Sequence, residues 1–308
     1  MNIKELAKDI EKNKKLTSGH RSCSGCGFPQ IVRTILASTN KPVVTSCATG
    51  CLEVTTTIYP FTSWNVPFIH SAFENSAVTM AGVESAYNAL KRKGKIDKEI
   101  KFVAFGGDGG TYDIGLQSLS GMLERGHDIL YVLYDNNAYM NTGIQRSSAT
   151  PLGASTTTAP AGKAHQGKEE FRKDITKIVA AHNIPYIAQA SLSNLMDLSM
   201  KAGKAFKIKG PKFIVCLQPC TLGWRYPTEK TVELAKIAVE SKFWPLYEIE
   251  NGKYKLNYKP SNPLPVEDYL KAQGRFKHLF KPENRHIIET IQKHTDSEWD
   301  KLLKLCGE

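Results

Sequence analysis

A glycine-rich corner with an aspartate at its centre constrains this chain more than any other feature. The corner, Gly106-Gly107-Asp108-Gly109-Gly110, ends the short apolar run 100–106, which is typical of a buried β-strand. Residues 112–125 then carry apolar side chains at helical spacing, and a second apolar run follows at 128–134. A strand, a helix and a strand in this order place the two strands parallel. The corner therefore lies at the carboxyl edge of a parallel sheet, where ligands bind in such folds.

The same alternation of strand and helix patterns continues on both sides of this unit. We expect further strands at 42–46, 184–188 and 212–217, and helices at 74–92, 169–182 and 192–208. Alternation of this kind predicts an α/β fold, in which a mainly parallel sheet carries helices on both faces. We expect this domain to occupy residues 1–247.

Two segments break the alternation. Residues 147–167 are rich in Thr, Ala, Gly and Pro and are too long for an ordinary turn, so we expect a functional loop near the site. Residues 248–308 form a C-terminal extension, which has little periodicity at first and then a charged helix. This extension either forms an arm that wraps a partner subunit or packs on its own domain, and the sequence leaves both alternatives open.

The chain is basic, with a net charge of +11 over 308 residues. Its lysines are scattered, which is typical of a solvated surface, although a docking face for an acidic electron carrier is an alternative. No zinc-finger spacing, RNP-like motif or basic heptad helix is present, which argues against nucleic-acid binding. No apolar run approaches the roughly 20 residues that span a bilayer, and the N-terminal segment lacks the apolar core of a signal peptide. We therefore expect a cytoplasmic protein with neither a nucleic-acid nor a membrane partner.

Asp108 distinguishes the glycine corner from an ordinary βα turn. Glycines let the backbone approach a phosphate, and a helix N-terminus favours its negative charge. A carboxylate here would repel the phosphate unless a cation lay between them, and Mg²⁺ is commonly shared by carboxylates and phosphates. Asn136 and Asn137 end the next strand, and adjacent parallel strands lie about 5 Å apart. If these strands are neighbours, Asp108 and Asn136 can share one magnesium ion.

The cysteines indicate a second metal site. There are seven, at positions 23, 26, 47, 51, 216, 220 and 306. Their odd number and uneven spacing argue against a disulfide framework and favour metal binding. Cys23 and Cys26 form a C-x-x-C motif, which supplies two of the four thiolates that a [4Fe–4S] cluster needs. A zinc ion with four cysteine ligands is the alternative.

Four cysteines compete for the two remaining ligand positions. Cys47 ends a predicted strand and Cys216 lies inside one, so both are expected to pack as small apolar side chains. Cys51 and Cys220 lie in predicted loops and are free to reach an ion. We therefore favour Cys51 and Cys220 as ligands, and we regard Cys306, in the terminal helix, as incidental.

The two halves of the corner pattern, Gly107-Asp108-Gly109 and Asn136-Asn137, resemble the thiamine diphosphate signature. The longer strings at 107–115 and 135–143 are similar, more narrowly, to the β subunit of 2-oxoacid:ferredoxin oxidoreductases of the pyruvate and 2-oxoisovalerate type. The resemblance runs from about residue 19 to residue 276. It implies the diphosphate-binding half of a thiamine diphosphate fold.

The resemblance also implies a role for individual residues. Asp108 and Asn136 would bind magnesium by their side chains, and Ala138 would bind it by its carbonyl oxygen. Gly107 and Gly109 would let the backbone bend around the diphosphate of the cofactor.

Two further groups of residues take their roles from the same resemblance. Asn141 would face the thiazolium ring and the substrate, with Thr142 beside it in the cofactor site. The resemblance also indicates Cys51 and Cys220, through the short sequences Ala-Thr-Gly-Cys and Pro-Cys in which they stand. These are the same two loop cysteines that the strand pattern favours. The implied [4Fe–4S] ligands are Cys23, Cys26, Cys51 and Cys220.

The implied reaction is the reversible oxidative decarboxylation of pyruvate to acetyl-CoA and carbon dioxide. Electrons would pass through the cluster to ferredoxin, and coenzyme A would collect the acyl group. The 2-oxoisovalerate and oxalate enzymes share this subunit pattern, so the substrate stays open. A non-catalytic iron–sulfur electron-transfer subunit would not need Asp108 with Asn136, and a simple thiamine-dependent decarboxylase would not need the four cysteines.

The chain is expected to be half of an active site. Thiamine enzymes that it resembles use a glutamate from a second domain to activate the aminopyrimidine, and this chain offers only the diphosphate-binding domain. The resemblance implies an α subunit that supplies this glutamate, together with a γ subunit and a ferredoxin-like δ subunit.

Overall fold

One mixed sheet organises the chain. The computed structural model describes residues 3–308, and within this range eight strands form a sheet in the order β2-β1-β3-β4-β6-β5-β7-β8. The strands are β1 (Val43–Ala48), β2 (Phe68–Ser71), β3 (Lys101–Gly107), β4 (Ile129–Asp135), β5 (Tyr186–Ser191), β6 (Lys212–Leu217), β7 (Tyr247–Glu250) and β8 (Lys253–Leu256). Strands β1 to β6 pair in parallel, whereas β7 and β8 pair antiparallel. The predicted α/β fold with a mainly parallel sheet is therefore confirmed.

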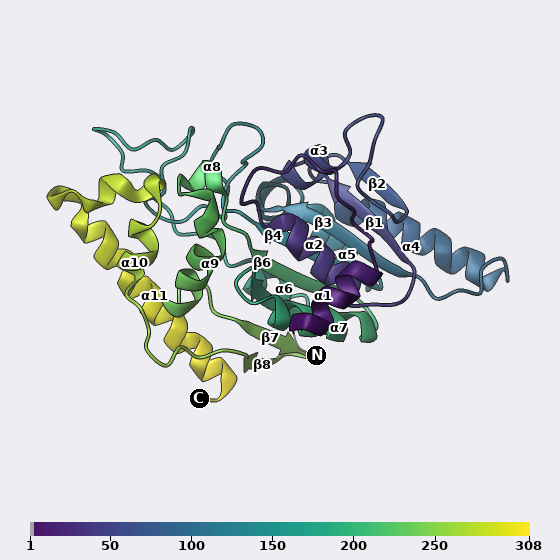
Figure 1. The fold of residues 1–308 in the computed structure, drawn as a ribbon. Helices are drawn as coiled ribbons and strands as arrows, with labels where there is room; N and C mark the ends of the chain where they lie inside the picture. Colours follow the sequence, from purple (N-terminus) through teal and green to yellow (C-terminus); the bar gives the residue numbers. More distant parts are fainter. Residues whose placement is uncertain (1–2) are drawn as a thin grey trace.

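Helices cover both faces of the sheet (Figure 1). In β4, Tyr131 and Leu133 pack into one apolar core, whereas Leu130 and Val132 pack into the other, as the period of two in a strand requires. The first core also holds α4 (Ser76–Arg92), α5 (Leu116–Glu124) and α6 (Ile175–Ala180), and the second holds α2 (Phe28–Ala37) and α7 (Leu195–Lys207). The other helices are α1 (Ile3–Lys12), α3 (Cys51–Thr56), α8 (Thr221–Trp224), α9 (Thr231–Glu240), α10 (Val266–Lys271) and α11 (Arg285–Cys306).

Each strand that the sequence predicts corresponds to one of β1, β3, β4, β5 and β6, with small shifts at the ends. Strand β3 lies directly beside β4, as a shared magnesium site requires. The helix predicted over 112–125 is α5, preceded by one π-helical turn, η1 (Gly109–Ile114). None of the helices within residues 3–308 is both long and apolar enough to cross a membrane.

The helix predicted over 169–182 is wrong in its first half, since only α6 is helical. Lys168 Nζ donates a 2.7 Å hydrogen bond to the carbonyl of Thr150, and the amide of Lys173 donates one of 3.0 Å to the carbonyl of Ser148. These bonds hold the segment 168–173 against the preceding loop instead of in a helix. Asp174 then starts α6, because its side chain accepts a 3.0 Å hydrogen bond from the amide of Lys177.

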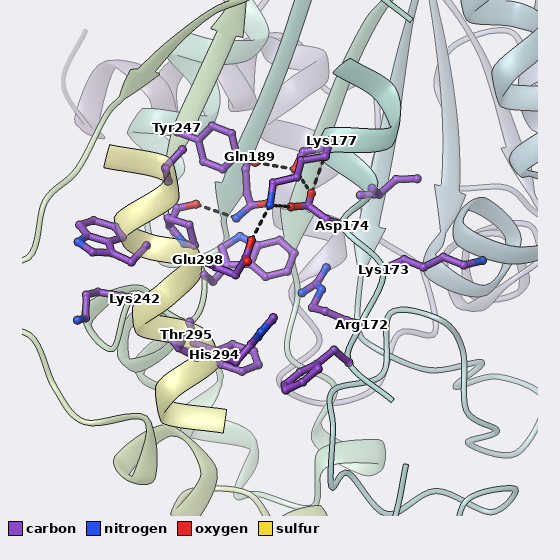
Figure 2. Close-up of a pocket in the computed structure, with 18 of the residues that line it drawn as sticks. Arg172, Lys173, Asp174, Lys177, Gln189, Lys242, Tyr247, His294, Thr295 and Glu298 are labelled. Carbon is purple, nitrogen blue, oxygen red and sulfur yellow. Dashed lines mark hydrogen bonds and ion pairs between the residues drawn. The ribbon is translucent and has the colours of Figure 1, made fainter. Parts of the chain in front are cut away.

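The C-terminal extension packs on its own domain. The expected boundary between residues 247 and 248 falls inside β7, which pairs with β5 and belongs to the sheet. Ile288, Ile291 and Leu302 of α11 are buried in the same apolar core as the sheet. Lys177 Nζ lies 2.5 Å from Glu298 of α11, which ties this helix to α6 (Figure 2).

Candidate functional site

The predicted cofactor residues meet at the carboxyl edge of β3 and β4. A pocket of about 30 Å³ at this edge is lined by all of the predicted cofactor residues and by one predicted cluster ligand. These residues are Gly107, Asp108, Gly109, Asn136, Ala138, Asn141, Thr142 and Cys51. Asp108 and Asn136 are buried at its base, and Asn141 and Thr142 are exposed. Residues predicted from two separate parts of the chain therefore form one site.

Gly109 has a steric reason to be glycine. A Cβ atom here would lie 2.1 Å from the ring of Tyr139. The Tyr139 hydroxyl donates a 2.9 Å hydrogen bond to the carbonyl of Gly109, which fixes the ring against the corner. The corner continues into the π-helical turn η1, a conformation that is often found at functional sites.

Asp108 is a buried carboxylate. Its side chain accepts a short hydrogen bond from the hydroxyl of Ser147, at the start of the loop that is predicted to be functional. Burial, and then the nearby charge of Asp135, raise the pKa of Asp108 well above its usual value. A buried carboxylate is costly unless a cation or hydrogen bonds compensate it. Asp108 therefore suits a cation ligand.

The surroundings of Asn136 fit magnesium. One terminal atom of its amide lies 2.8 Å from Asp108 Oδ1 and 2.9 Å from the carbonyl oxygen of Ala138. With nitrogen in this place, the amide donates two hydrogen bonds. With oxygen there, the Asn136 oxygen is separated from each of the other two oxygens by about the 2.9 Å that neighbouring ligands have in octahedral Mg²⁺ coordination. The residues can therefore hold the ion that the sequence predicts, with the amide oxygen turned inward.

A hydroxyl group in the same pocket is unsatisfied. Tyr134 is 2% exposed, and its hydroxyl has no hydrogen-bond partner within residues 3–308. A Cβ atom on Gly50 would lie 2.8 Å from this hydroxyl, so it sits at the Cys51 side of the pocket. A buried donor without an acceptor fits a site built for an oxygen-rich or anionic group.

The loop after β4 is held by residues that the sequence did not reveal. Asp135 accepts hydrogen bonds from the hydroxyl of Tyr112 at 2.7 Å and from Arg172 at 2.9 Å. Asp135 also accepts a 3.0 Å hydrogen bond from the backbone N–H of Asn137, which fixes the turn around Asn136. Arg172 carries no signal in the sequence, because it is distant in the chain and lies in a segment predicted to be helical.

The four predicted cluster cysteines lie near one another. Burial raises the pKa of the thiols of Cys26 and Cys51 to about 12, and the other cysteines add to the effect. Each of these two thiols interacts electrostatically with Cys23 and Cys220. Gln218 Nε2 donates to Cys26 Sγ at 3.6 Å, and the amide N–H of Gly223 donates to Cys220 Sγ at 3.4 Å.

A cluster and a single ion place different demands on these four thiols. Within residues 3–308, no three Cys, His, Asp or Glu side chains gather closely enough to hold one metal ion. A tetrahedral zinc site needs thiolates about 2.3 Å from a common centre. A cubane cluster keeps its thiolates farther apart, because each one binds a different iron atom.

The remaining cysteines lie where the sequence places them. Cys47 in β1 and Cys216 in β6 are fully buried in the apolar core. Cys306 lies in α11 at the edge of the other core. None of the three lines the pocket at Asp108.

A second cavity, of about 250 Å³, lies between α11 and the segment that leads into α6 (Figure 2). Its wall includes the aromatic side chains of Phe171 and Trp244. Lys177, one of the lysines that line it, is already paired with Asp174 at 3.1 Å and with Glu298 at 2.5 Å. None of the predicted cofactor residues lines this cavity.

Comparison with known proteins agrees with this geometry. Residues 45–216 match the family model "Thiamine pyrophosphate enzyme, C-terminal TPP binding domain". A curated relative, pyruvate synthase subunit PorB of Thermotoga maritima, is 55% identical over 99% of this chain and 96% of its own length. The chain belongs to the family of PorB subunits. The resemblance to 2-oxoacid:ferredoxin oxidoreductases is thereby confirmed.

A second curated relative and a solved structure also match this chain. Ketoisovalerate oxidoreductase subunit VorB of Pyrococcus abyssi is 44% identical over 98% of both chains. A solved structure of 2-oxoglutarate:ferredoxin oxidoreductase from Magnetococcus marinus matches with a TM-score of 0.55 and 19% identity, over 73% of this chain and 80% of that one. The structural match shows a shared fold. The names of the two curated relatives thus carry different 2-oxoacids, pyruvate in one and ketoisovalerate in the other.

Proposed function

We propose that this chain is the β subunit of a thiamine diphosphate-dependent 2-oxoacid:ferredoxin oxidoreductase that acts on pyruvate. The complete enzyme would convert pyruvate and coenzyme A to acetyl-CoA and carbon dioxide, reversibly, and pass electrons to ferredoxin. The observation that carries this proposal is the shared pocket of Asp108, Asn136 and Cys51. A decarboxylase would need only the first two residues, and an electron-transfer subunit only the third.

Asp108, Asn136 and the carbonyl of Ala138 would hold Mg²⁺, and through it the diphosphate. When bound, thiamine diphosphate supplies the electron sink for decarboxylation. Ser147 holds the Asp108 carboxylate in place by its hydrogen bond. Asn141 lies exposed in the lining of the pocket, where we assign it to orient the substrate.

Cys23, Cys26, Cys51 and Cys220 would bind one [4Fe–4S] cluster. Because burial raises the pKa of the Cys26 and Cys51 thiols, cluster binding would release protons from them and would supply compensating positive charge. Cys51 would bring the cluster to the wall of the cofactor pocket, which suits short-range electron transfer. Four thiols that must stay reduced agree with a cytoplasmic location.

The rest of the cofactor site would come from other subunits. The pocket in this chain has room for about two water molecules, which suits an ion but not a whole cofactor. Three large apolar side chains that are close to proposed site residues in the sequence are exposed. Tyr59 is 94% exposed, Phe61 77% and Leu222 65%. Tyr59 and Phe61 follow α3, and Leu222 lies in α8, along the same edge of the sheet (Figure 1). Exposed apolar groups of this kind favour an interface with the α, γ or δ subunit.

Pyruvate is proposed as the substrate because the PorB relative that covers nearly the whole chain is a pyruvate synthase subunit. The VorB relative keeps 2-oxoisovalerate as a second candidate. The deciding experiment is ferredoxin reduction by the assembled complex against pyruvate, 2-oxoisovalerate, oxalate and 2-oxoglutarate.

The same preparation tests both cofactors. We expect a brown protein that releases thiamine diphosphate on denaturation and contains four iron atoms per copy of this chain beyond those of the other subunits. A colourless complex that still decarboxylates pyruvate would refute the cluster. A brown complex that neither holds thiamine diphosphate nor uses any 2-oxoacid would refute the catalytic role.

A further inference from the structure

Arg275 is a buried cation that no carboxylate pairs with in the part of the chain that the structure describes. It lies in the 3-10 helix η3 (Gly274–Phe280) of the C-terminal extension and is 1% exposed. Its Nε donates to Gln273 Oε1 at 2.9 Å, and its Nη2 donates to Asn137 Oδ1 at 3.1 Å. Both acceptors are neutral amides. Burial lowers the pKa of Arg275 to about 10, which still leaves the guanidinium charged at neutral pH.

Its other neighbours do not neutralise this charge. The guanidinium lies 4.0 Å from the ring centre of Trp224, and its Nη1 has no hydrogen-bond partner within residues 3–308. Burial raises the pKa of Tyr269, which interacts with the guanidinium, to about 12, so this phenol stays neutral. Asp135 also interacts with Arg275, but it is already paired with Arg172 at 2.9 Å.

The free charge lies between the proposed cluster and the proposed magnesium site. On one side it interacts with Cys220, which precedes α8, the helix that ends in Trp224. On the other side it bonds Asn137, which follows the magnesium ligand Asn136. A [4Fe–4S] cluster with four thiolates is negatively charged when oxidised and more so when reduced. A nearby buried cation therefore stabilises the reduced form.

We propose that Arg275 is the counter-charge of the cluster bound at Cys220 and favours its reduced state, while its bond to Asn137 positions the loop of the magnesium site. The inference rests on the proposed function, because it needs the cluster. The cluster, when bound, would accept the electrons of the 2-oxoacid one at a time, and no bond to Arg275 would form or break. Arg275 is thus a positioning residue, whose charge affects how readily the cluster accepts an electron.

The test is a redox titration of the full-length chain, prepared without oxygen and followed by EPR. Arg275→Gln removes the charge, and Arg275→Lys keeps it. Arg285→Gln is the matched control, since Arg285 is an exposed arginine paired with Glu267 at 2.9 Å in the same C-terminal extension. Iron, sulfide and bound thiamine diphosphate are measured on every sample.

We expect Arg275→Gln to keep its iron and to shift the ratio of reduced to oxidised cluster at least tenfold toward the oxidised form, which is about 59 mV for one electron. Arg275→Lys and Arg285→Gln should stay close to the unsubstituted chain. If the Gln variant loses iron while the Lys variant keeps it, the need for positive charge is supported.

Three results would overturn the inference: an unchanged or raised midpoint in an iron-loaded Gln variant, equal shifts in the Lys and Gln variants, or loss of iron from both. Absence of iron from the unsubstituted chain is a separate outcome. It would refute the proposed cluster itself, and with it any role for Arg275 toward that cluster.

Discussion

Trp224 donates a 2.7 Å hydrogen bond from its indole Nε1 to the backbone carbonyl of Asn136. Trp224 ends the short helix α8, which begins directly after Cys220. Asn136 follows the end of β4 and is a proposed magnesium ligand. One side-chain bond therefore joins the turn of a proposed cluster ligand to the loop of the proposed cofactor site.

Replacement of this tryptophan tests the connection. Trp224→Phe keeps an aromatic face for Arg275 but leaves the buried Asn136 carbonyl without its donor. A buried acceptor left unpaired costs about 1–3 kcal/mol, so we expect lower stability in urea unfolding. We also expect weaker Mg²⁺-dependent binding of thiamine diphosphate, measured by equilibrium dialysis.

Trp244→Phe is the matched control for this prediction. Trp244 is also buried, and its Nε1 donates a 2.8 Å hydrogen bond to a backbone carbonyl, that of Ala190 in β5. Its loss should cost similar stability without a selective effect on the cofactor. Equal cofactor binding in both variants would contradict the proposed connection.

Asp108→Asn should separate cofactor binding from folding. Without Mg²⁺ the substitution removes a carboxyl group whose ionisation is opposed by burial and by Asp135, so the apo chain should be no less stable than the unsubstituted one. With Mg²⁺ and thiamine diphosphate at about 100 times the dissociation constant, only the unsubstituted chain should gain stability, by about 2.7 kcal/mol. An equal gain in the variant, seen by thermal unfolding, would show that Asp108 does not hold the ion.

The sequence predicts best what depends on local pattern. The strands that flank the glycine corner are continuous apolar runs, because both of their faces are buried, so β3 and β4 could be recognised directly. Asp108 and Asn136 lie at the ends of those two strands, so the pairing of the strands is enough to bring the two residues together.

Long-range contacts could not be predicted in the same way. The failure over 169–182 arises because Lys168 bonds the carbonyl of Thr150, a contact that leaves no helical or loop signature in the sequence. Arg275 looks like one more basic residue of an irregular tail, and only the fold places it beside Asn137 and Trp224. The low periodicity of the extension gives no sign that it supplies β8 and most of β7 to the sheet and a charge to the site.

The cysteine assignment predicts a contrast between neighbouring positions. Cys220→Ala should lose most of the iron, because a cluster needs four thiolates, whereas Cys216→Ala should keep it. Cys216 is fully buried in β6, so its loss should cost only some stability. In the same way, Cys51→Ala should lose most of the iron, and Cys47→Ala should keep it. The measurement is the iron content per chain, taken together with acid-labile sulfide. Full iron content in the Cys220 variant would contradict the assignment of the ligands.

The packing of α11 predicts a loss of stability in acid. Burial opposes ionisation of Glu298, but hydrogen bonds from Lys177 and Lys301 outweigh it and lower the pKa of this carboxyl to about 2. In the unfolded chain the pKa is about 4.3. The bonds therefore stabilise the fold above about pH 4, and this contribution disappears as the pH falls toward 2.

Glu298→Gln should remove this dependence. Because the carboxyl is partly exposed, the expected cost at pH 6 is about 0.2–1 kcal/mol, and the difference from the unsubstituted apo chain should shrink at pH 3. Urea unfolding at the two pH values measures both quantities. Glu289→Gln, an exposed position on the same helix, is the control and should change neither.

The proposed half-site predicts that this chain is inactive alone. Activation of the aminopyrimidine needs a carboxylate within about 2.6–3.2 Å of the proton that it moves. Glu53, which lies near Cys51 in α3, is already bonded to the Thr57 hydroxyl at 2.5 Å. We therefore expect negligible release of carbon dioxide from pyruvate by the pure chain, even when bound thiamine diphosphate and iron are both verified. Addition of the partner subunits should restore turnover, and a partner whose activating glutamate is replaced by glutamine should not. Turnover by the single chain at the rate of the whole complex would show that the carboxylate lies in this chain after all.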